Sequence, residues 1–525
     1  MGGRRHGLDN GDDGRGTRQA TCHHGTVPVA ASQTTKKTIT HTLKDMKHSL
    51  LATILILLTA TATATRREVH ILSINDMHAA FDRFPQFATL ADSLRQLYPD
   101  ILILSAGDNR TGNPYNDLAA VPSRPMVDLM NIAGFSYTAL GNHEFDGGID
   151  RLRTTINNSW FKYLSANITA PDSMRLHIEP FALTERGGTS IAILGLTQRD
   201  SLSLHPDTSP ANVRGISFAP YSETARRYAW LRNVCDVLIL LTHIGVEDDV
   251  RLAREMPEAD IIIGGHTHTR LDPCIMEGNV MITQAGRLMR YATHITLTVD
   301  NGKVVGRKAE LLDVANRAKR DGRIKTLVEE YCDIPAMRRV LTHVERDITE
   351  KEAVGCIMAD ALREETKADI AITNAGGVRL SQIDKGELTV NDVYRTDPFG
   401  NKAVTYTMTG KEVERLLEEA CKSDGYGPAY VSGMTYSITL GRDNTDVRGI
   451  SLMDNNGKKM DMGRIYTVTI NSYMAETIGM VRDRECTYSY DTTAEMLTAW
   501  LERQPSIDYA GTRRVSITLS GKTSR

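Results

Sequence analysis

The stretch ALGNHEFDGG, from Ala139 to Gly148, ends a short apolar run with a glycine and then crowds polar groups together. An amide, an imidazole and two carboxylates follow within a few positions, in the residues Asn142, His143, Glu144 and Asp146. An apolar run bounded in this way is typical of a buried strand. The stretch therefore predicts a strand whose carboxyl end delivers several polar side chains to one edge of a sheet.

Four other apolar runs end in the same way. They are VHILSIN (69–75) before Asp76 and His78, DILILSA (100–106) before Asp108, DVLILL (236–241) before His243, and ADIIIG (259–264) before His266 and His268. Amphipathic stretches at 85–97, 124–134, 222–233 and 250–255 separate these runs and predict helices. The alternation predicts βαβ-type units in an α/β fold, with all five strand ends at one rim.

A rim with this many histidine, aspartate and asparagine side chains predicts a metal centre. A single histidine at a strand end is more often a structural residue, but five polar strand ends are poorly explained in that way. Ligands of these types without paired cysteines favour Mn, Fe or Zn. The number of candidate ligands exceeds what one tetrahedral ion can bind, and it suits two ions about 3.5–4 Å apart that share a carboxylate. Such a pair is suited to in-line attack at phosphorus.

The charge balance excludes one class of partner. The 525 residues carry 62 Lys and Arg against 65 Asp and Glu, which gives a net charge of −3. A nucleic-acid polymer requires a strongly basic surface, so we expect no nucleic-acid partner. A small anionic substrate remains compatible with the sequence because its pocket needs only a few local cations.

The segment MKHSLLATILILLTATATA (46–64) has the form of a secretory signal peptide, although a buried core helix is the alternative. Lys47 precedes an apolar core at 50–58, which is too short to span a membrane. Because a signal peptide begins a chain, we interpret residues 1–45 as an upstream over-extension of the reading frame or as disordered. The segment ends in the small-x-small cleavage site Ala62-Thr63-Ala64, and the residue directly after it is not a cysteine that could carry a lipid. No apolar tail closes the chain, so we expect a periplasmic or secreted protein without a stable membrane anchor.

At this point the motifs resemble those of a known family. The set DMH, GDN, GNHEFD, LLTH and GGHTHT resembles the signature of calcineurin-like metallophosphoesterases, and NAGGVR (374–379), DPFGN (397–401) and VSGM (431–434) are similar to the 5′-nucleotidase C-terminal domain. The resemblance covers roughly residues 68–519. It implies a four-layer α/β/β/α metallophosphoesterase domain at 66–314 and a second α/β substrate-specificity domain at 339–520. The charged, helix-prone stretch between them predicts a linker helix at 315–338, although a helix packed wholly on the first domain is the alternative.

The resemblance also implies a role for each rim residue. Two divalent metal ions (Mn, Zn, Fe, Mg or Ca) are expected, the first held by Asp76, His78 and His268, the second by Asn142, His243 and His266, with Asp108 bridging both. His143 is implied to be the catalytic histidine that contacts the phosphate, and Asp146 to orient its imidazole. We expect a structural role for Glu144.

The second domain is implied to bind the substrate. The corresponding positions are Asn374, Gly376, Gly377, Arg379, Phe399, Asn401 and Tyr473. Arg379 offers a planar fork for phosphate, and Phe399 and Tyr473 correspond to the aromatic pair that sandwiches a nucleobase. Two positions depart from the family pattern. The aspartate of a GGDG-like turn is missing after Tyr473, where the chain reads Glu476-Thr477, and residues 349–355 contain no arginine.

These features favour an exported two-metal phosphohydrolase that resembles 5′-nucleotidase and converts nucleoside 5′-phosphates into nucleoside and phosphate. The departures in the second domain leave related esters open, namely a 2′,3′-cyclic nucleotide, a UDP-sugar or another phosphomonoester. A catalytically inactive ligand-binding protein is a further alternative. The intact set of candidate ligands at all five strand ends argues against it.

Overall fold

The structure is a computed structural model that describes residues 66–201, 203–423, 427–441 and 446–519. The segments 1–45 and 46–64, interpreted above as an extension and a signal peptide, lie outside the described residues. None of the helices in the described ranges combines the length and the apolar content needed to cross a membrane.

The first sheet has seven strands, in the order β15-β14-β1-β2-β3-β4-β6. The five strands from β1 to β6 in this order run parallel, and β14 and β15 complete the sheet in antiparallel pairing. Their bounds are β1 (Arg67–Ile74), β2 (Leu102–Ser105), β3 (Tyr137–Ala139), β4 (Lys162–Leu164), β6 (Ile178–Glu179), β14 (Tyr291–Asp300) and β15 (Lys303–Asp313). Three of the five predicted strands are therefore parallel neighbours, and their carboxyl ends share one edge.

The other two predicted strands belong to a second sheet of six strands, in the order β12-β13-β11-β10-β8-β7. The strands β13, β11, β10 and β8 are parallel, and the edge strands β12 and β7 are antiparallel to their neighbours. Their bounds are β7 (Phe181–Arg186), β8 (Thr189–Thr197), β10 (Val237–His243), β11 (Ile261–Ile263), β12 (Ile275–Glu277) and β13 (Val280–Thr283), and a separate pair joins β5 (Ile168–Thr169) to β9 (Ser217–Phe218).

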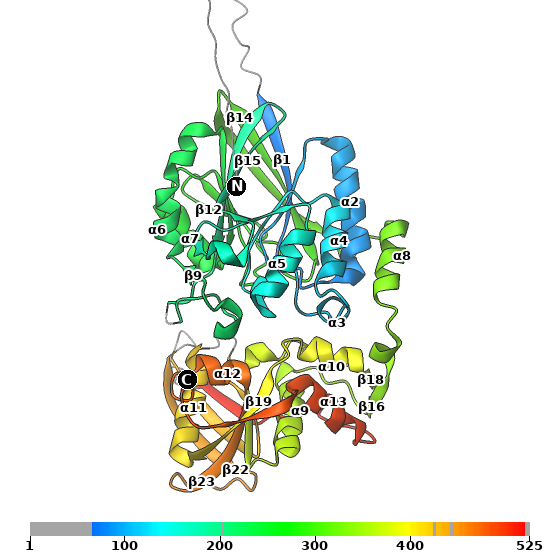
Figure 1. Cartoon of the computed structure of the whole chain (residues 1–525), viewed down its shortest axis with the longest axis vertical. Coiled ribbons are helices and arrows are strands. Elements are labelled where there is room, and N and C mark those ends of the chain that lie inside the picture. Colours follow the sequence, from blue (N-terminus) through cyan, green and yellow to red (C-terminus); the bar gives the residue numbers. More distant parts are fainter. Residues whose placement is uncertain (1–65, 202, 424–426, 442–445, 520–525) are drawn as a thin grey trace, which may run out of the picture. The chain divides into compact units, whose positions relative to one another are not determined.

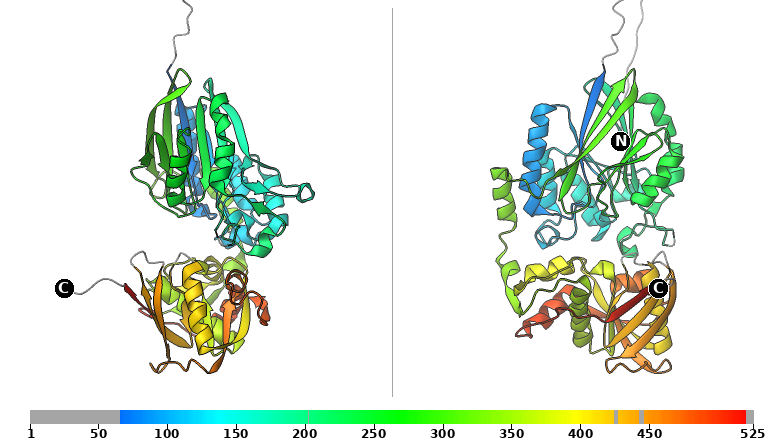
Figure 2. Two further views of the ribbon diagram at one scale, coloured as in Figure 1. Left: turned by 90° about the vertical axis from the view of Figure 1, so that its left-hand side faces the viewer. Right: turned by 180° about the vertical axis from the view of Figure 1, so that it is seen from behind.

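Helices cover the outer faces of the two sheets (Figures 1 and 2). The side chains of β1 alternate between layers, so that Ile71 packs against the second sheet while Leu72 and Ile74 pack against helices. The first sheet is covered by α2 (Phe84–Leu97) and α4 (Arg124–Ala133), and the second by α6 (Tyr221–Arg227) and α7 (Val246–Glu255). The predicted four-layer α/β/β/α arrangement is confirmed.

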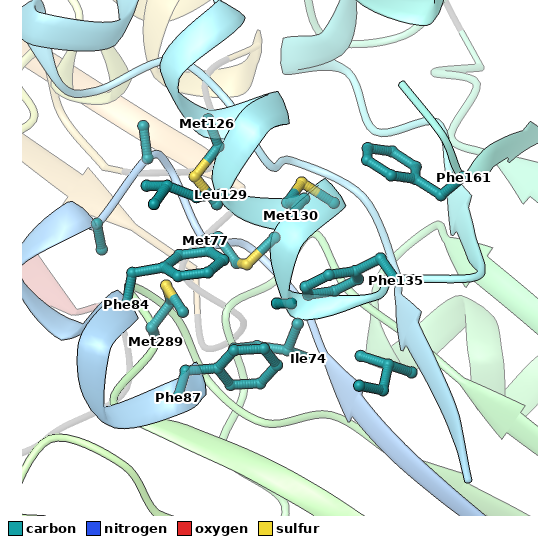
Figure 3. Packing of buried hydrophobic residues seen from close by; sticks show 14 of the residues in the cluster. Ile74, Met77, Phe84, Phe87, Met126, Leu129, Met130, Phe135, Phe161 and Met289 are labelled. Carbon is teal, nitrogen blue, oxygen red and sulfur yellow. The ribbon is translucent and has the colours of Figure 1, made fainter. Parts of the chain in front are cut away.

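The core beneath α2 and α4 also anchors the first metal motif. The rings of Phe87 and Phe135 stack with centroids 5.6 Å apart. Met77, which lies between Asp76 and His78, is fully buried in the same cluster (Figure 3). A side chain packed at interior density is costly to move, so Met77 fixes the backbone on which its two polar neighbours stand.

Two predicted helices differ from the structure. The expected helix at 222–233 is divided into α6 and the 3-10 helix η5 (Ala229–Val234). The expected linker helix is also shorter than its stretch: α8 (Gly322–Tyr331) is followed by the 3-10 helix η6 (Pro335–Arg338). Asp321 sets the start of α8, because its carboxylate accepts the backbone N–H groups of residues 323 and 324.

A second α/β domain follows, as predicted. Its main sheet has the order β20-β17-β23-β19-β24, a three-stranded sheet has the order β22-β21-β25, and β16 pairs with β18. The strands are β16 (Val340–Val344), β17 (Ile370–Thr373), β18 (Gly386–Thr389), β19 (Lys402–Thr409), β20 (Tyr430–Ser432), β21 (Met434–Leu440), β22 (Val447–Asp454), β23 (Ile465–Asn471), β24 (Thr487–Thr492) and β25 (Val515–Leu519). The helices are α9 (Lys351–Thr366), α10 (Val390–Thr396), α11 (Gly410–Ser423), α12 (Ser472–Thr477) and α13 (Thr493–Glu502).

Candidate metal and substrate site

The loops after β1 and β2 are joined by backbone hydrogen bonds. The N–H of Asp76 donates to the carbonyl of Gly107 at 3.0 Å, and the N–H of His78 donates to the carbonyl of Asp108 at 3.0 Å. Several rim residues adopt a left-handed backbone, with φ of 48° at Asp76, 45° at His78, 53° at Asp108, 81° at His266 and 57° at His268. Such strained conformations cluster at functional sites, where the surrounding structure holds them.

Four of the predicted ligands form one compact group. One ligand atom from each of Asp76, His78, Asp108 and His268 lies within 4.8 Å of the other three. His268 Nε2 is 3.4 Å from Asp76 Oδ1, and His78 Nε2 is 4.0 Å from Asp108 Oδ2. These side chains come from three loops, after β1, β2 and β11, and the structure brings together the residues predicted for the first metal ion.

The remaining predicted ligands adjoin the same group. His243 Nε2 lies 3.2 Å from Asp108 Oδ2, and His266 Nδ1 lies 3.0 Å from Asn142 Oδ1. Asp108 Oδ2 thus approaches one predicted ligand of each ion, His78 and His243, as a bridging carboxylate oxygen requires. The close approach depends on Gly141, where a Cβ atom would fall 2.1 Å from Asp108 Oδ1.

The histidine tautomers fit metal binding. His78 Nδ1 lies 3.0 Å from the carbonyl oxygen of Thr111, and His243 Nδ1 lies 2.6 Å from that of Ala106. A carbonyl can only accept, so Nδ1 carries a proton in both rings, and Nε2 is the nitrogen that faces the cluster. His78 Nε2 and His268 Nε2 approach to 3.1 Å, a contact between nitrogens that a cation between them would stabilise. The donor set of oxygens and imidazole nitrogens suits Mn, Fe or Zn.

The two aspartates of the cluster are held in their charged form. Burial raises the pKa of Asp108, but the positive potential of His243 and His143 outweighs burial and leaves the pKa well below its usual range. Burial also opposes ionisation of Asp76, yet the hydrogen bond and charge of His268 lower its pKa. Anionic carboxylates at full burial provide the charge that divalent cations need.

A histidine–aspartate pair lies beside the metal ligands. His143 Nδ1 lies 2.7 Å from Asp146 Oδ2, and the backbone N–H of His143 donates to Asp108 Oδ1 at 2.9 Å. The 3-10 helix η2 (His143–Phe145) places both residues on one side of the loop after β3. Burial lowers the pKa of His143, but the negative charges of Asp108 and Asp146 raise it above its ordinary value. The imidazole is therefore oriented with Nδ1 on the carboxylate and Nε2 available to a substrate.

Glu144 connects the backbone of two rim loops. Its carboxylate accepts the N–H of Gly141 at 2.7 Å, of Asp108 at 2.9 Å and of Asn109 at 2.8 Å. A buried carboxylate with three backbone donors is satisfied without a ligand. The geometry is that of a structural residue, which agrees with the sequence prediction.

A pocket of about 690 Å³, open to solvent, lies over this rim. It is lined by His143 and Asp146 together with all seven positions predicted for substrate binding, namely Asn374, Gly376, Gly377, Arg379, Phe399, Asn401 and Tyr473. Arg379 Nη2 lies 3.2 Å from His78 Nε2. The rings of Phe399 and His143 are stacked, with centroids 5.8 Å apart and planes inclined by 23°.

The sequence did not predict several residues of the site. Asp207, Thr208, Ser209 and Asn212 line the same pocket from the segment after β8, which carries no recognisable motif. Asn75 was also missed, although it directly precedes the DMH motif. Its Nδ2 donates to Asp76 Oδ2 at 2.6 Å, and its Oδ1 accepts the N–H of Ala285 at 2.7 Å. Asn75 thereby orients a predicted ligand.

The position where the chain departs from the family pattern makes a contact of its own. The hydroxyl of Ser209 donates to the carboxylate of Glu476, on α12. The same segment is tied to the rim, because Asn142 Nδ2 donates to the carbonyl of Asp207 at 3.0 Å. Glu476, where the chain departs from the family pattern, therefore makes a side-chain contact that joins α12 to the segment of Ser209, which lines the pocket.

Comparisons with known proteins agree with this geometry. Residues 69–270 match the calcineurin-like phosphoesterase family, and residues 336–481 match the 5′-nucleotidase C-terminal domain. Protein UshA of Yersinia enterocolitica is 27% identical over 516 residues, covering 84% of this chain and 92% of that protein. A 5′-nucleotidase of Vibrio cholerae is 27% identical over 513 residues, covering 82% of this chain and 90% of its own length.

The fold is shared with a solved structure. The 5′-nucleotidase precursor of Thermus thermophilus superimposes with a TM-score of 0.77 at 23% identity, over 86% of this chain and 99% of that one. A calcineurin-like phosphoesterase domain binds two divalent metal ions, which agrees with the cluster of aspartate and histidine ligands.

Proposed function

We propose that the substrates of this chain are nucleoside 5′-phosphates, which it hydrolyses to nucleoside and phosphate. The chain joins a calcineurin-like phosphoesterase domain to a 5′-nucleotidase C-terminal domain and is a metal-dependent phosphoric ester hydrolase. Two divalent ions, when bound, supply the Lewis acidity that activates water and neutralises phosphoryl charge. We assign Asp76, His78 and His268 to the first ion, Asn142, His243 and His266 to the second, and Asp108 to both.

The observation that carries the proposal is the composition of the pocket. The lining combines His143, which lies beside the metal ligands, with a guanidinium and an aromatic ring from the second domain, in Arg379 and Phe399. A nucleotide presents the same pair of features, an anionic phosphate at one end and a flat base at the other.

The side chains divide the chemical work. The planar fork of Arg379 suits bidentate contact with phosphate oxygens. The Nδ1–H group of His143 donates to Asp146, so Nε2 faces the phosphoryl group or the leaving oxygen. At that place a positioned imidazole stabilises developing charge or transfers a proton. The ring of Phe399 provides a stacking surface for a base, and Asn374 and Asn401 offer polar groups at the same wall.

The test is the release of inorganic phosphate from a panel of esters. The panel contains nucleoside 5′-monophosphates, 2′,3′-cyclic nucleotides, a UDP-sugar and p-nitrophenyl phosphate, each with the chelated protein and after Mn²⁺ is restored. We expect the highest kcat/KM with a nucleoside 5′-monophosphate. A preference for another ester would refute the substrate assignment, and binding of nucleotides without phosphate release from any ester would indicate a ligand-binding protein.

We also propose that the protein is exported. The support is the signal-like segment at 46–64. Charged nucleotides cross membranes poorly, so an exported hydrolase would make nucleosides available for uptake. N-terminal sequencing of the native protein should give a terminus near Thr65. A terminus within residues 2–40, or recovery in the cytosol alone, would contradict export.

A further inference from the structure

The carboxylate of Asp146 has a partner on the side opposite His143. Asp146 Oδ2 faces His143 Nδ1 at 2.7 Å, while Oδ1 accepts the hydroxyl of Thr208 at 3.1 Å. The side chain of Thr111 makes a further hydrogen bond to Asp146. Both oxygens are therefore engaged, and the plane of the carboxylate is set by groups on both sides.

The hydroxyl of Thr208 is itself oriented. Asn212 Nδ2 donates to Thr208 Oγ1 at 3.2 Å. A hydroxyl has one proton to donate, so a hydroxyl that accepts from an amide is directed to use that proton on its other neighbour, Asp146. Thr208 is buried, with 3% of its surface exposed, and water has little access to replace this bond.

The segment that carries Thr208 is anchored on either side of it. The N–H of Asp207 donates to Gln198 Oε1 at 2.8 Å, and its carbonyl accepts the amide of Asn142 at 3.0 Å. Ser209 begins the 3-10 helix η4 (Pro210–Val213), and its hydroxyl accepts the N–H of Ala211. The threonine is thus held by a defined backbone rather than by a free loop.

From these contacts we infer that Thr208 is a positioning residue for the reaction: its hydroxyl, directed by Asn212, holds the Asp146 carboxylate in the orientation that aligns the His143 imidazole with the substrate. The inference rests on the proposed function of the His143–Asp146 pair. It extends that function to a residue 62 positions further along the chain, which no motif of the sequence singles out.

The mechanism predicts an effect on kcat and little effect on substrate binding. Without the hydroxyl, the side chains of Thr111 and His143 still contact the carboxylate, but its Oδ1 loses the bond from Thr208 and the imidazole is held less firmly in one direction. A misplacement of about 1 Å can lower a rate by roughly 10²-fold, and a partial loss of orientation should lower kcat by about 10-fold. The KM should stay within about 2-fold, because Thr208 is not expected to bind the phosphate or the base.

Three variants test the inference with the ester that the wild type hydrolyses fastest. Thr208→Val replaces the hydroxyl by a methyl group of similar size and should lose about 10-fold in kcat, whereas Thr208→Ser keeps the hydroxyl and should stay within about 2-fold of wild type. Thr224→Val is the matched control. Thr224 is a fully buried threonine on α6 whose hydroxyl accepts from Arg227, so the same change there should leave kcat unaltered.

A double variant separates positioning from a general structural effect. If Thr208 acts through Asp146, then Thr208→Val should have less than about 2-fold effect in the Asp146→Ala background, because the group it orients is absent. Equal losses in both backgrounds would overturn the inference. So would a Thr208→Val variant with wild-type kcat, or a Thr208→Ser variant as impaired as Thr208→Val.

A crystal structure of Thr208→Val gives a readout that does not depend on activity. We expect the Asp146 carboxylate to leave its single orientation and the contact with His143 Nδ1 to lengthen. A carboxylate in the same orientation as in the wild type would refute the inference, whether or not the protein hydrolyses a phosphate ester. A wild-type protein that hydrolyses no phosphate ester would refute the proposed function, which is a separate result. If Thr208→Val fails to fold, then kcat and the crystal structure are measured on Thr208→Ala instead, since that change removes the hydroxyl without adding a methyl group.

Discussion

The metal rim of the first domain and the pocket wall of the second domain are built differently. At the rim, Asp76, His78 and Asp108 are buried and are held by loops that are hydrogen-bonded to each other. On the wall, Arg379, Phe399, Asn401 and Tyr473 are half-buried side chains at the pocket surface. A substitution at the rim therefore removes a buried side chain from loops that hold each other, whereas a substitution on the wall replaces a half-buried side chain.

The sharpest test of the contrast is removal of the metal ligands at the rim. Asp108→Ala deletes the proposed bridging carboxylate, and we expect it to abolish activity and to lower bound metal, as exhaustive chelation of the wild type should also do. Metal content by mass spectrometry and phosphate release are the measurements. Readdition of Mn²⁺ should restore the chelated wild type but not the variant. Activity that survives chelation would break the assignment of the rim.

A change beside the rim should separate catalysis from metal binding. His143→Ala removes the proposed acid–base group and should lower kcat by roughly 10²–10⁴-fold. Metal content should remain near wild type, because His143 is not assigned as a ligand. If His143→Ala lost metal to the same extent as Asp108→Ala, then the division of labour among the rim residues would be wrong.

A change at the wall should affect binding alone. Phe399→Ala removes the proposed stacking surface, and stacking of a base on an aromatic side chain contributes about 1–3 kcal/mol. We expect KM to rise by about 10-fold for a nucleoside monophosphate, with metal content and kcat close to wild type. Phe399→Tyr, which keeps a ring, is the control. An equal rise in KM for p-nitrophenyl phosphate would argue against a role in binding the base.

A further test is a pH dependence of stability, which differs in sign between the rim and a buried carboxyl of the second domain. Burial raises the pKa of Asp397, a buried residue two positions before Phe399, from 3.8 to about 6. Hydrogen bonds from Thr493 and from the backbone of Phe399 oppose the change. Between these values the folded state binds more protons than the unfolded chain. Asp397 therefore favours folding at low pH, and its contribution is lost as pH rises from about 4 to about 6.

The shift of about two units corresponds to about 3 kcal/mol. Urea unfolding of the wild type and of Asp397→Asn at several pH values measures it. The variant should lack the decline in stability that this carboxyl contributes between about pH 4 and pH 6. Superimposable pH profiles of the two proteins would show that Asp397 does not titrate in this range. The rim aspartates should not contribute such a decline, because the pKa values of Asp76 and Asp108 are lowered.

The features predicted from the sequence are those encoded locally. The run at 69–75 and the residues Asp76 and His78 are adjacent in the chain, so periodicity and polarity locate a strand end together with its ligands. The hydrophobic period of a strand does not indicate which strand pairs with it. The division of the five predicted strands between two sheets could be expected only from the family resemblance. The helix expected at 222–233 is divided between α6 and η5, a boundary that hydrophobic pattern alone does not define.

The residues that were missed depend on tertiary contacts. Thr208 reaches Asp146 only because the segment after β8 folds back toward the loop after β3. A threonine in a segment without hydrophobic period gives no signal in a single sequence. Asn75 could have been found, because its position beside DMH suggested a partner for Asp76.

The left-handed backbone at the rim restricts how this centre could be re-engineered. Asp, Asn and His are several-fold enriched at positive φ among residues other than glycine, while a β-branched residue there is a genuine outlier. At Asp76 and at His266 the preferences of the coordination sphere and of the peptide chain select the same few side chains. Replacing a ligand in order to change the metal is therefore limited to Asp, Asn or His at these positions, unless the loop is redesigned together with the ligand.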